Sequence, residues 1–125
     1  MTSYELIFED RTTYLYVLVS GELNRKTDRE IDARIKSECE RLERKKVLID
    51  IRESSSRLSY LENFVAATSF RERMGPYIEA MAIVDAEEQK ENSELFEITA
   101  ISKGARLKFF TSTIEAEKWL VEGRG

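Results

Sequence analysis

Hydroxyl groups that could carry chemistry are concentrated in one stretch, which holds Ser54, Ser55 and Ser56 and, three residues later, Ser59. Arg52 and Arg57 flank the three consecutive serines. A phosphate on one of these serines, or an anionic ligand, would face the free amides and the positive dipole of a following helix, with two guanidinium groups nearby. Serines are also preferred helix caps and turn residues, so a purely structural role is the competing interpretation.

Two aspartates offer a second kind of chemistry, because Asp50 and Asp85 each lie near the carboxyl end of a predicted parallel strand. Two carboxylates could hold a cation or act as acid and base. The sequence offers them no third ligand and no nucleophile, so we expect them to cap turns or to pair with Arg52. The chain has no histidine and one cysteine, Cys39, which excludes histidine triads and imidazole or multi-thiolate zinc sites. We expect no catalytic residue, no metal, no cofactor and no enzymatic activity.

Length and composition indicate one α/β domain over residues 1–125, with an ordered core at about 4–121. The 20 basic residues are interleaved with 24 acidic ones at a net charge of −4, which argues against nucleic acid as a partner. We expect no membrane span and no signal peptide, because no long apolar segment is visible. A single cysteine cannot form an internal disulfide, so we expect a cytoplasmic location.

The elements that must position these residues follow from periodicity and capping signals. Strands are expected at 4–9, 13–19, 47–52, 77–84 and 106–110, and helices at 27–43, 58–74, 93–103 and from 112. Capping boxes are expected at Thr27–Glu30, Ser59–Glu62 and Ser112–Glu115, and the second helix is expected to begin anywhere from Ser55 to Ser59. Gly75 should end it with a left-handed cap, and Pro76 cannot continue it. The order ββαβαβαβα predicts a mixed five-stranded sheet with an N-terminal antiparallel hairpin, covered by about four helices.

For the helices expected at 27–43 and 58–74, the spacing of apolar residues predicts which face packs inward. On the first, Cys39 falls on the apolar stripe and is expected in the core. The inner stripe expected for the second helix consists of Leu58, Leu61, Phe64, Val65 and Thr68. Its expected outer face consists of Asn63, Ser69, Arg71 and Arg73, with Phe70 near the edge. An exposed Phe70 beside Arg71 and Arg73 would make an interface patch, and a Phe70 in the core is the alternative.

Two segments carry a resemblance to a known family. These are the strand Val47-Leu48-Ile49-Asp50-Ile51, which leads into the serines, and the ending 107–120, Leu-Lys-Phe-Phe-Thr-Ser-Thr-Ile-Glu-Ala-Glu-Lys-Trp-Leu. From about Tyr4 to Leu120 the chain resembles STAS domains of the SpoIIAA-like, anti-sigma-factor antagonist-like type. The resemblance implies a non-enzymatic bacterial regulatory module that docks a protein partner through the turn after the third strand and the following helix. It also implies a kinase-modified serine in an Asp-Ser-Ser-Gly-like motif.

The segment 52–57 lacks that motif and has no glycine, and Ser54, Ser55, Ser56 and Ser59 all align loosely with the switch position. The first hypothesis is therefore a regulatory protein-interaction module whose docking surface comprises the turn 53–59 and the helix after it. The second is a domain that binds a small molecule or a lipid in a pocket between helices and sheet. A homodimer through a sheet edge or a helix face is compatible with either.

Overall fold

The computed structural model describes residues 3–75 and 77–123, so Pro76 and the ends at 1–2 and 124–125 lie outside the described residues. The elements run in the order β1 (Tyr4–Asp10), β2 (Leu15–Gly21), α1 (Arg25–Leu42), β3 (Lys46–Ser54), α2 (Tyr60–Met74), β4 (Ala80–Val84), a 3₁₀ turn η1 (Glu87–Gln89), α3 (Lys90–Ser102), β5 (Leu107–Phe110) and α4 (Thr113–Glu122). The predicted order ββαβαβαβα is confirmed.

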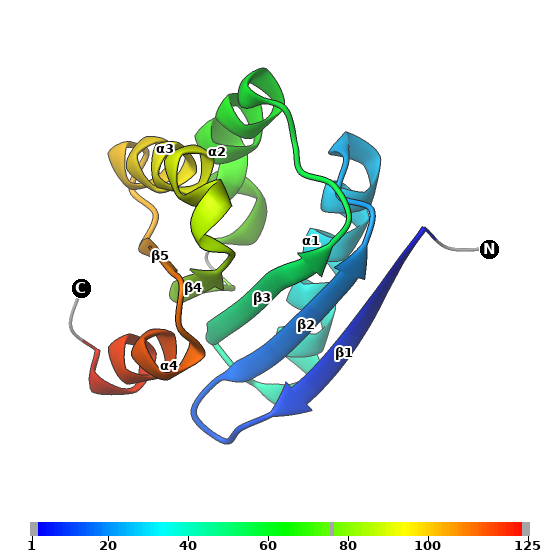
Figure 1. The fold of residues 1–125 in the computed structure, drawn as a ribbon. Coiled ribbons are helices and arrows are strands. Elements are labelled where there is room, and N and C mark those ends of the chain that lie inside the picture. The colour runs from blue at the N-terminus through cyan, green and yellow to red at the C-terminus, as the bar shows by residue number, and fades with distance from the viewer. Residues whose placement is uncertain (1–2, 76, 124–125) are drawn as a thin grey trace.

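The five strands form one mixed sheet in the order β1-β2-β3-β4-β5 (Figure 1). Strands β1 and β2 are antiparallel, and every later neighbour is parallel. The predicted α/β sheet with an N-terminal hairpin is therefore confirmed. Because β2, β3 and β4 run in the same direction, the loops that follow them open at one edge of the sheet.

Two apolar clusters hold the helices to the two faces of the sheet. The larger packs α1, α2 and α3 against side chains that include Val17, Ile49 and Met81. The smaller packs α4, through Trp119 and Leu120, against the opposite face. The sheet therefore has three helices on one side and one on the other, and the layer under α2 and α3 is where a cavity could form.

Cys39 lies in the larger cluster with 2% of its surface exposed, which confirms the prediction of a core residue. Burial raises the pKa of its thiol to about 12, so almost no thiolate is present near neutral pH.

We expect the folded protein at pH 8 to react with a thiol-specific disulfide reagent at least about 100-fold more slowly than the urea-unfolded chain. A Ser37→Cys, Cys39→Ala variant, with its thiol at an exposed position of α1, is the control and should react rapidly when folded. Equal rates for folded and unfolded wild type would contradict a buried thiol.

The ends of the helices and strands correct four details of the sequence prediction. Helix α1 begins at Arg25, because Asn24 is its N-cap and shares a reciprocal capping box with Thr27. Gly75 has φ −77°, an extended conformation instead of the expected left-handed one. Strand β4 begins three residues later than predicted, and α3 begins three residues earlier, directly after η1. The predicted N-caps Ser59 and Ser112 are confirmed.

Candidate functional site

The serine turn lies at the carboxyl end of β3 and is tied to the loop between β2 and α1. The backbone amide of Ser55 donates to the carbonyl of Gly21 at 2.7 Å. The hydroxyl of Ser56 accepts from the Leu23 amide and donates to the Leu23 carbonyl, both at 3.1 Å. These three bonds hold the turn before α2 in one conformation.

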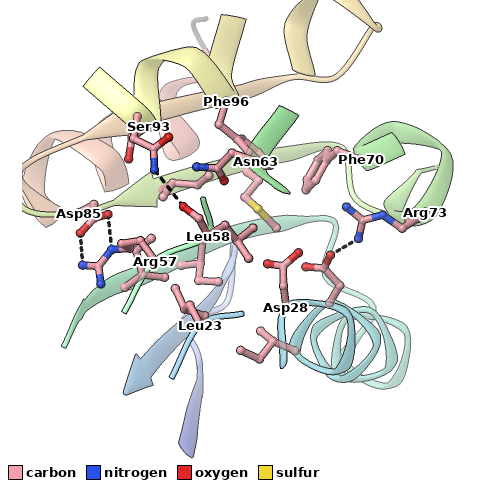
Figure 2. A pocket seen from close by; sticks show the side chains of 17 residues that line it. Leu23, Asp28, Arg57, Leu58, Asn63, Phe70, Arg73, Asp85, Ser93 and Phe96 are labelled. Carbon is pink, nitrogen blue, oxygen red and sulfur yellow. Dashed lines mark hydrogen bonds and ion pairs between the residues drawn. The ribbon is translucent and has the colours of Figure 1, made fainter. Parts of the chain in front are cut away.

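Arg57 fixes the same turn from the inside. Its Nε and Nη2 donate to the two carboxylate oxygens of Asp85 at 3.0 and 2.6 Å, and its Nη1 donates to the carbonyls of Ser54 and Ser56 at 2.9 and 3.0 Å. The Asp85 side chain is 1% exposed, and that of Arg57 is 16% exposed (Figure 2). A buried carboxylate and two carbonyls already take most of the N–H donors of Arg57, so its pairing with an external anion stays a prediction.

Arg52 does not join Arg57 at the turn. Side chains alternate along a strand, so Arg52 shares the α4 face of the sheet with Leu48 and Asp50. It forms a bidentate ion pair with Asp50 at 3.0 and 2.8 Å, which raises the pKa of Arg52. The prediction that Asp50 pairs with Arg52 is confirmed. The two arginines leave the chain on different sides and each pairs with its own aspartate, so the structure does not bring them together, and anion pairing by either one stays a prediction.

The four serines have different surroundings. Ser55 and Ser59 are exposed, and the Ser59 hydroxyl caps α2 by accepting from the Glu62 amide at 3.2 Å. The hydroxyl of Ser56 is bonded to Leu23, and that of Ser54 is buried with no hydrogen-bond partner in the part of the chain that the structure describes. A kinase could therefore reach Ser55 and Ser59 without unfolding the turn.

Helix α2 presents a different face to solvent from the one predicted. Its buried side chains are Asn63, Ala67, Phe70 and Met74. The side chains expected inside lie outside, with Leu61 69%, Phe64 48% and Val65 42% exposed, and Tyr60 is 70% exposed beside them. The predicted inner stripe is therefore wrong for Leu61, Phe64 and Val65. We call Tyr60, Leu61, Phe64 and Val65 the α2 apolar face.

The patch predicted from Phe70, Arg71 and Arg73 does not exist at the surface. Phe70 is 6% exposed and packs edge-to-face on Phe96 of α3, with ring centroids 6.1 Å apart. Arg73 donates to the carboxylate of Asp32 on α1, to the hydroxyl of Ser69 at 3.0 Å and to a carbonyl of its own helix. Arg71 alone remains exposed. Aromatic packing between α2 and α3 thus takes Phe70 into the core, which was the alternative interpretation.

A cavity of about 90 Å³, partly open to solvent, lies beneath α2 and is lined by α1, α2, α3 and the sheet. Figure 2 shows the side chains that line it. Its apolar lining comes from all of these layers and comprises Leu23, Ile31, Ile49, Ile51, Leu58, Phe70, Met81, Ile83 and Phe96. Its polar and charged lining comprises Asp28, Asp32, Arg57, Asn63, Arg73, Asp85, Asn92 and Ser93. An engineered cavity of about 150 Å³ holds one benzene molecule, so the space here is that of a smaller molecule.

Among the charged groups that line the cavity, Asp28 has a strongly raised pKa. Burial, together with the negative charge of Asp32 one turn along α1, raises the pKa of Asp28 to about 7. Sequence reasoning missed both this residue and Asn63, which it placed on the outer face of α2. An aspartate pair spaced i, i+4 in a helix is a visible signal, but the sequence alone does not show that the pair faces inward.

Comparison with known proteins finds similar solved structures, two of which are described here. No protein-family model and no curated protein sequence matches the chain. The crystal structure of an anti-sigma factor antagonist from Mycobacterium paratuberculosis aligns with a TM-score of 0.63 at 17% identity, over 95% of both chains. A DUF3478-family protein with a SpoIIAA-like fold from Shewanella loihica aligns with a TM-score of 0.60 at 20% identity, over 94% of both chains.

These two alignments show that the chain has the SpoIIAA-like fold, as expected from the strand 47–51 and the ending 107–120. In residues 3–75 and 77–123, no helix is both long enough and apolar enough to cross a bilayer. The same residues contain no cluster of three or more cysteine or acidic side chains able to hold a metal ion.

Proposed function

We propose that this protein is a non-enzymatic regulatory module that binds another protein through the turn 53–59 and the α2 apolar face. The observation that carries the proposal is the exposure of four neighbouring apolar side chains, Tyr60, Leu61, Phe64 and Val65, directly after the fixed turn. Apolar and aromatic side chains form the centres of protein interfaces. One of the aligned structures is described as an anti-sigma factor antagonist, which supports a regulatory role for this chain.

The local structure supports this surface as a docking site in two ways. Ser56 and Arg57 hold the turn with hydrogen bonds, so a partner would meet a preformed loop and little conformational entropy would be lost on binding. Ser59 and Glu62 form a reciprocal capping box, which fixes the first turn of α2 where Tyr60 and Leu61 lie. The apolar side chains are therefore presented on a rigid helix end.

We expect a Leu61→Asp substitution to abolish partner binding while leaving the fold intact. Leu61 is 69% exposed, so the charge stays in water in the free protein and the free energy of unfolding should change by less than about 0.5 kcal/mol. In the complex the same charge would be buried without a partner, and affinity should fall at least about 10-fold. The measurement is affinity capture from a lysate of the native host, quantified by mass spectrometry, followed by titration with the purified partner.

The matched control is Ile114→Asp, which adds the same charge at an 80% exposed isoleucine of α4, on the other side of the sheet. This variant should capture the same partners as the wild type. If Leu61→Asp and wild type capture the same proteins in equal amounts, the α2 apolar face is not the docking surface.

A more specific form of the proposal is that phosphorylation of this surface controls partner binding. The candidate phosphorylation sites are Ser55 and Ser59, because both are exposed. Ser55→Asp and Ser59→Asp variants should weaken capture if a negative charge in the turn releases the partner. Ser56→Asp is not a clean mimic, because the Ser56 hydroxyl is bonded to the Leu23 backbone. Unchanged binding by both Ser55→Asp and Ser59→Asp would reject the switch and leave the docking surface untouched.

A further inference from the structure

We propose that the cavity beneath α2 binds a small organic ammonium ion of about four heavy atoms, with Asp28 taking the ammonium group and Asn63 bonding a hydroxyl at the other end. The proposal stands on three observations that do not depend on the docking surface. They are a carboxylate without an ion pair, an amide without a hydrogen-bond partner, and a volume that fits one small molecule. Figure 2 shows Asp28 and Asn63 among the side chains that line the cavity.

The charges around the cavity leave one carboxylate without an ion pair. Asp85 pairs with Arg57, and Asp32 pairs with Arg73. Asp28 forms no ion pair and accepts no side-chain hydrogen bond from any residue in 3–75 or 77–123, although it lines the same cavity. A partly buried carboxylate in apolar surroundings is costly without a cation, so a cationic ligand would supply the missing charge.

The second observation is the side chain of Asn63, which faces the cavity from α2. Asn63 is 9% exposed, and no hydrogen bond among residues 3–75 and 77–123 involves its side-chain amide, whose atoms reach the accessible space of the cavity. Polar groups inside a protein are nearly always hydrogen-bonded, so this amide in the cavity wall is free to bond a molecule that enters the cavity. Because an amide carries both a donor and an acceptor, a hydroxyl is a suitable partner.

Volume sets the size of the ligand. Benzene, with six heavy atoms, occupies an engineered cavity of about 150 Å³, so about 90 Å³ corresponds to about four heavy atoms. The apolar lining, which includes Ile31, Ile49 and Met81, suits a short carbon chain between the two polar ends. Ethanolamine has these features, with an ammonium group, two carbons and a hydroxyl.

The pH dependence of binding follows from Asp28. The charged groups that face it are Arg29 and Asp32 on α1 and Glu62 and Arg73 on α2. From α3 the lining residues are Asn92, Ser93 and Phe96, all uncharged, and Arg57 and Asp85 neutralise each other. With the pKa of Asp28 at about 7, the carboxylate is mostly protonated below that pH. Affinity for an ammonium ion should therefore rise about 10-fold per pH unit up to about pH 7 and then level off.

The experiment compares three molecules of equal size, ethanolamine, n-propylammonium and ethane-1,2-diol, at constant ionic strength. Each is titrated into ¹⁵N-labelled protein at pH 7.5, and the amide shifts of α1 and α2 are followed. For ethanolamine we expect saturable shifts with a Kd between about 0.1 and 5 mM, a range suited to a ligand of four heavy atoms. The diol, which has no charge, should bind at least about 10-fold more weakly.

Two variants assign the two ends of the ligand. Asp28→Asn should weaken ethanolamine at least about 10-fold and remove its advantage over the diol. Asn63→Leu should remove the advantage of ethanolamine over n-propylammonium, which has no hydroxyl. Glu40→Gln, at an exposed position of α1, is the control and should leave every Kd within about two-fold.

Any of the following results would overturn the proposal. Absence of saturable shifts up to about 50 mM would mean that the cavity holds only water. Equal affinity for the diol and ethanolamine, or unchanged binding by Asp28→Asn, would remove the carboxylate from the site. These results are independent of the Leu61→Asp capture experiment, because Leu61 does not line the cavity.

Discussion

Replacing Asp28 with Asn is expected to raise the free energy of unfolding at pH 8 by about 2–3 kcal/mol and to leave it unchanged at about pH 4. The pKa of Asp28 is about 7 in the folded protein, against an ordinary value of 3.8 for an aspartate side chain. Between these two values the folded protein holds the proton more tightly than the unfolded chain does. The wild type therefore loses stability as the pH rises from about 4 to about 7, and a side chain that cannot ionise does not.

The size of the effect follows from the pKa. One unit corresponds to about 1.4 kcal/mol, so the full shift corresponds to about 4 kcal/mol. The Asn variant loses the favourable interaction of a carboxylate with the N-terminal end of α1, worth about 0.3–1 kcal/mol, and rearrangement of Arg73 reduces the difference further.

Urea denaturation of both proteins at pH 4, 6 and 8 measures this prediction. The difference between Asp28→Asn and wild type should grow with pH across the series. Glu40→Gln removes an exposed carboxylate from the same helix and should stay within about 0.5 kcal/mol of wild type at every pH. A variant less stable than wild type at pH 8 would show that Asp28 is stabilised in its ionised form, and that the cavity needs no cation.

Arg57→Met is expected to destabilise the protein by about 3–5 kcal/mol, since it leaves the Asp85 carboxylate buried with no opposite charge. Methionine keeps most of the length of the side chain, so little packing is lost. The carbonyls of Ser54 and Ser56 lose their donors at the same time, which loosens the turn.

Two further variants separate charge from geometry at this position. Arg57→Lys keeps the charge but loses the two-pronged bond, and should cost about 1–2 kcal/mol. Adding Asp85→Asn to Arg57→Met should recover more than half of the loss, because no buried charge then remains. Arg41→Met breaks the exposed ion pair with Glu38 on α1 and, as the control, should cost less than about 1 kcal/mol. If Arg57→Met also cost less than about 1 kcal/mol, the Asp85 carboxylate would have to be hydrated when the arginine is absent.

The Arg57 result also bears on the docking proposal. Arg57 and Ser56 hold the turn that precedes Tyr60 and Leu61, so a loosened turn should weaken partner binding without altering the α2 apolar face. Partner affinity measured with Arg57→Lys should then fall. The affinity for ethanolamine should instead depend on whether Asp28 is present. The two proposed sites can thus be tested apart, although both adjoin α2.

Much of the fold was predictable because local signals agree with one another. The alternation and β-branched residues of the strands, the caps at Ser59 and Ser112, and the stripe containing Cys39 are all encoded within a few residues of chain. Parallel strands joined by helices then allow few arrangements of the sheet. The position of the serine turn at the carboxyl end of β3 followed from the same reasoning.

The orientation of α2 could not be predicted in this way. Its outward face contains Leu61, Phe64 and Val65, and its inward face contains Asn63 and Ala67, so hydrophobicity alone favours the wrong face. The inward face is selected by contacts with another helix, above all the packing of Phe70 on Phe96, 26 residues further along the chain. Partners so distant in sequence leave no periodic signal.

By itself, the sequence determined the order of elements, the mixed sheet and the place of the turn, since these depend on propensities and caps that act over short stretches. Only the tertiary structure decided which side chains face one another. It paired Arg57 with Asp85, turned Leu61 to solvent, and brought Asp28 and Asn63 to one cavity. The physical reason is that charge pairing and burial depend on distances across the fold, and a side chain's surroundings exist only once the helices have packed on the sheet.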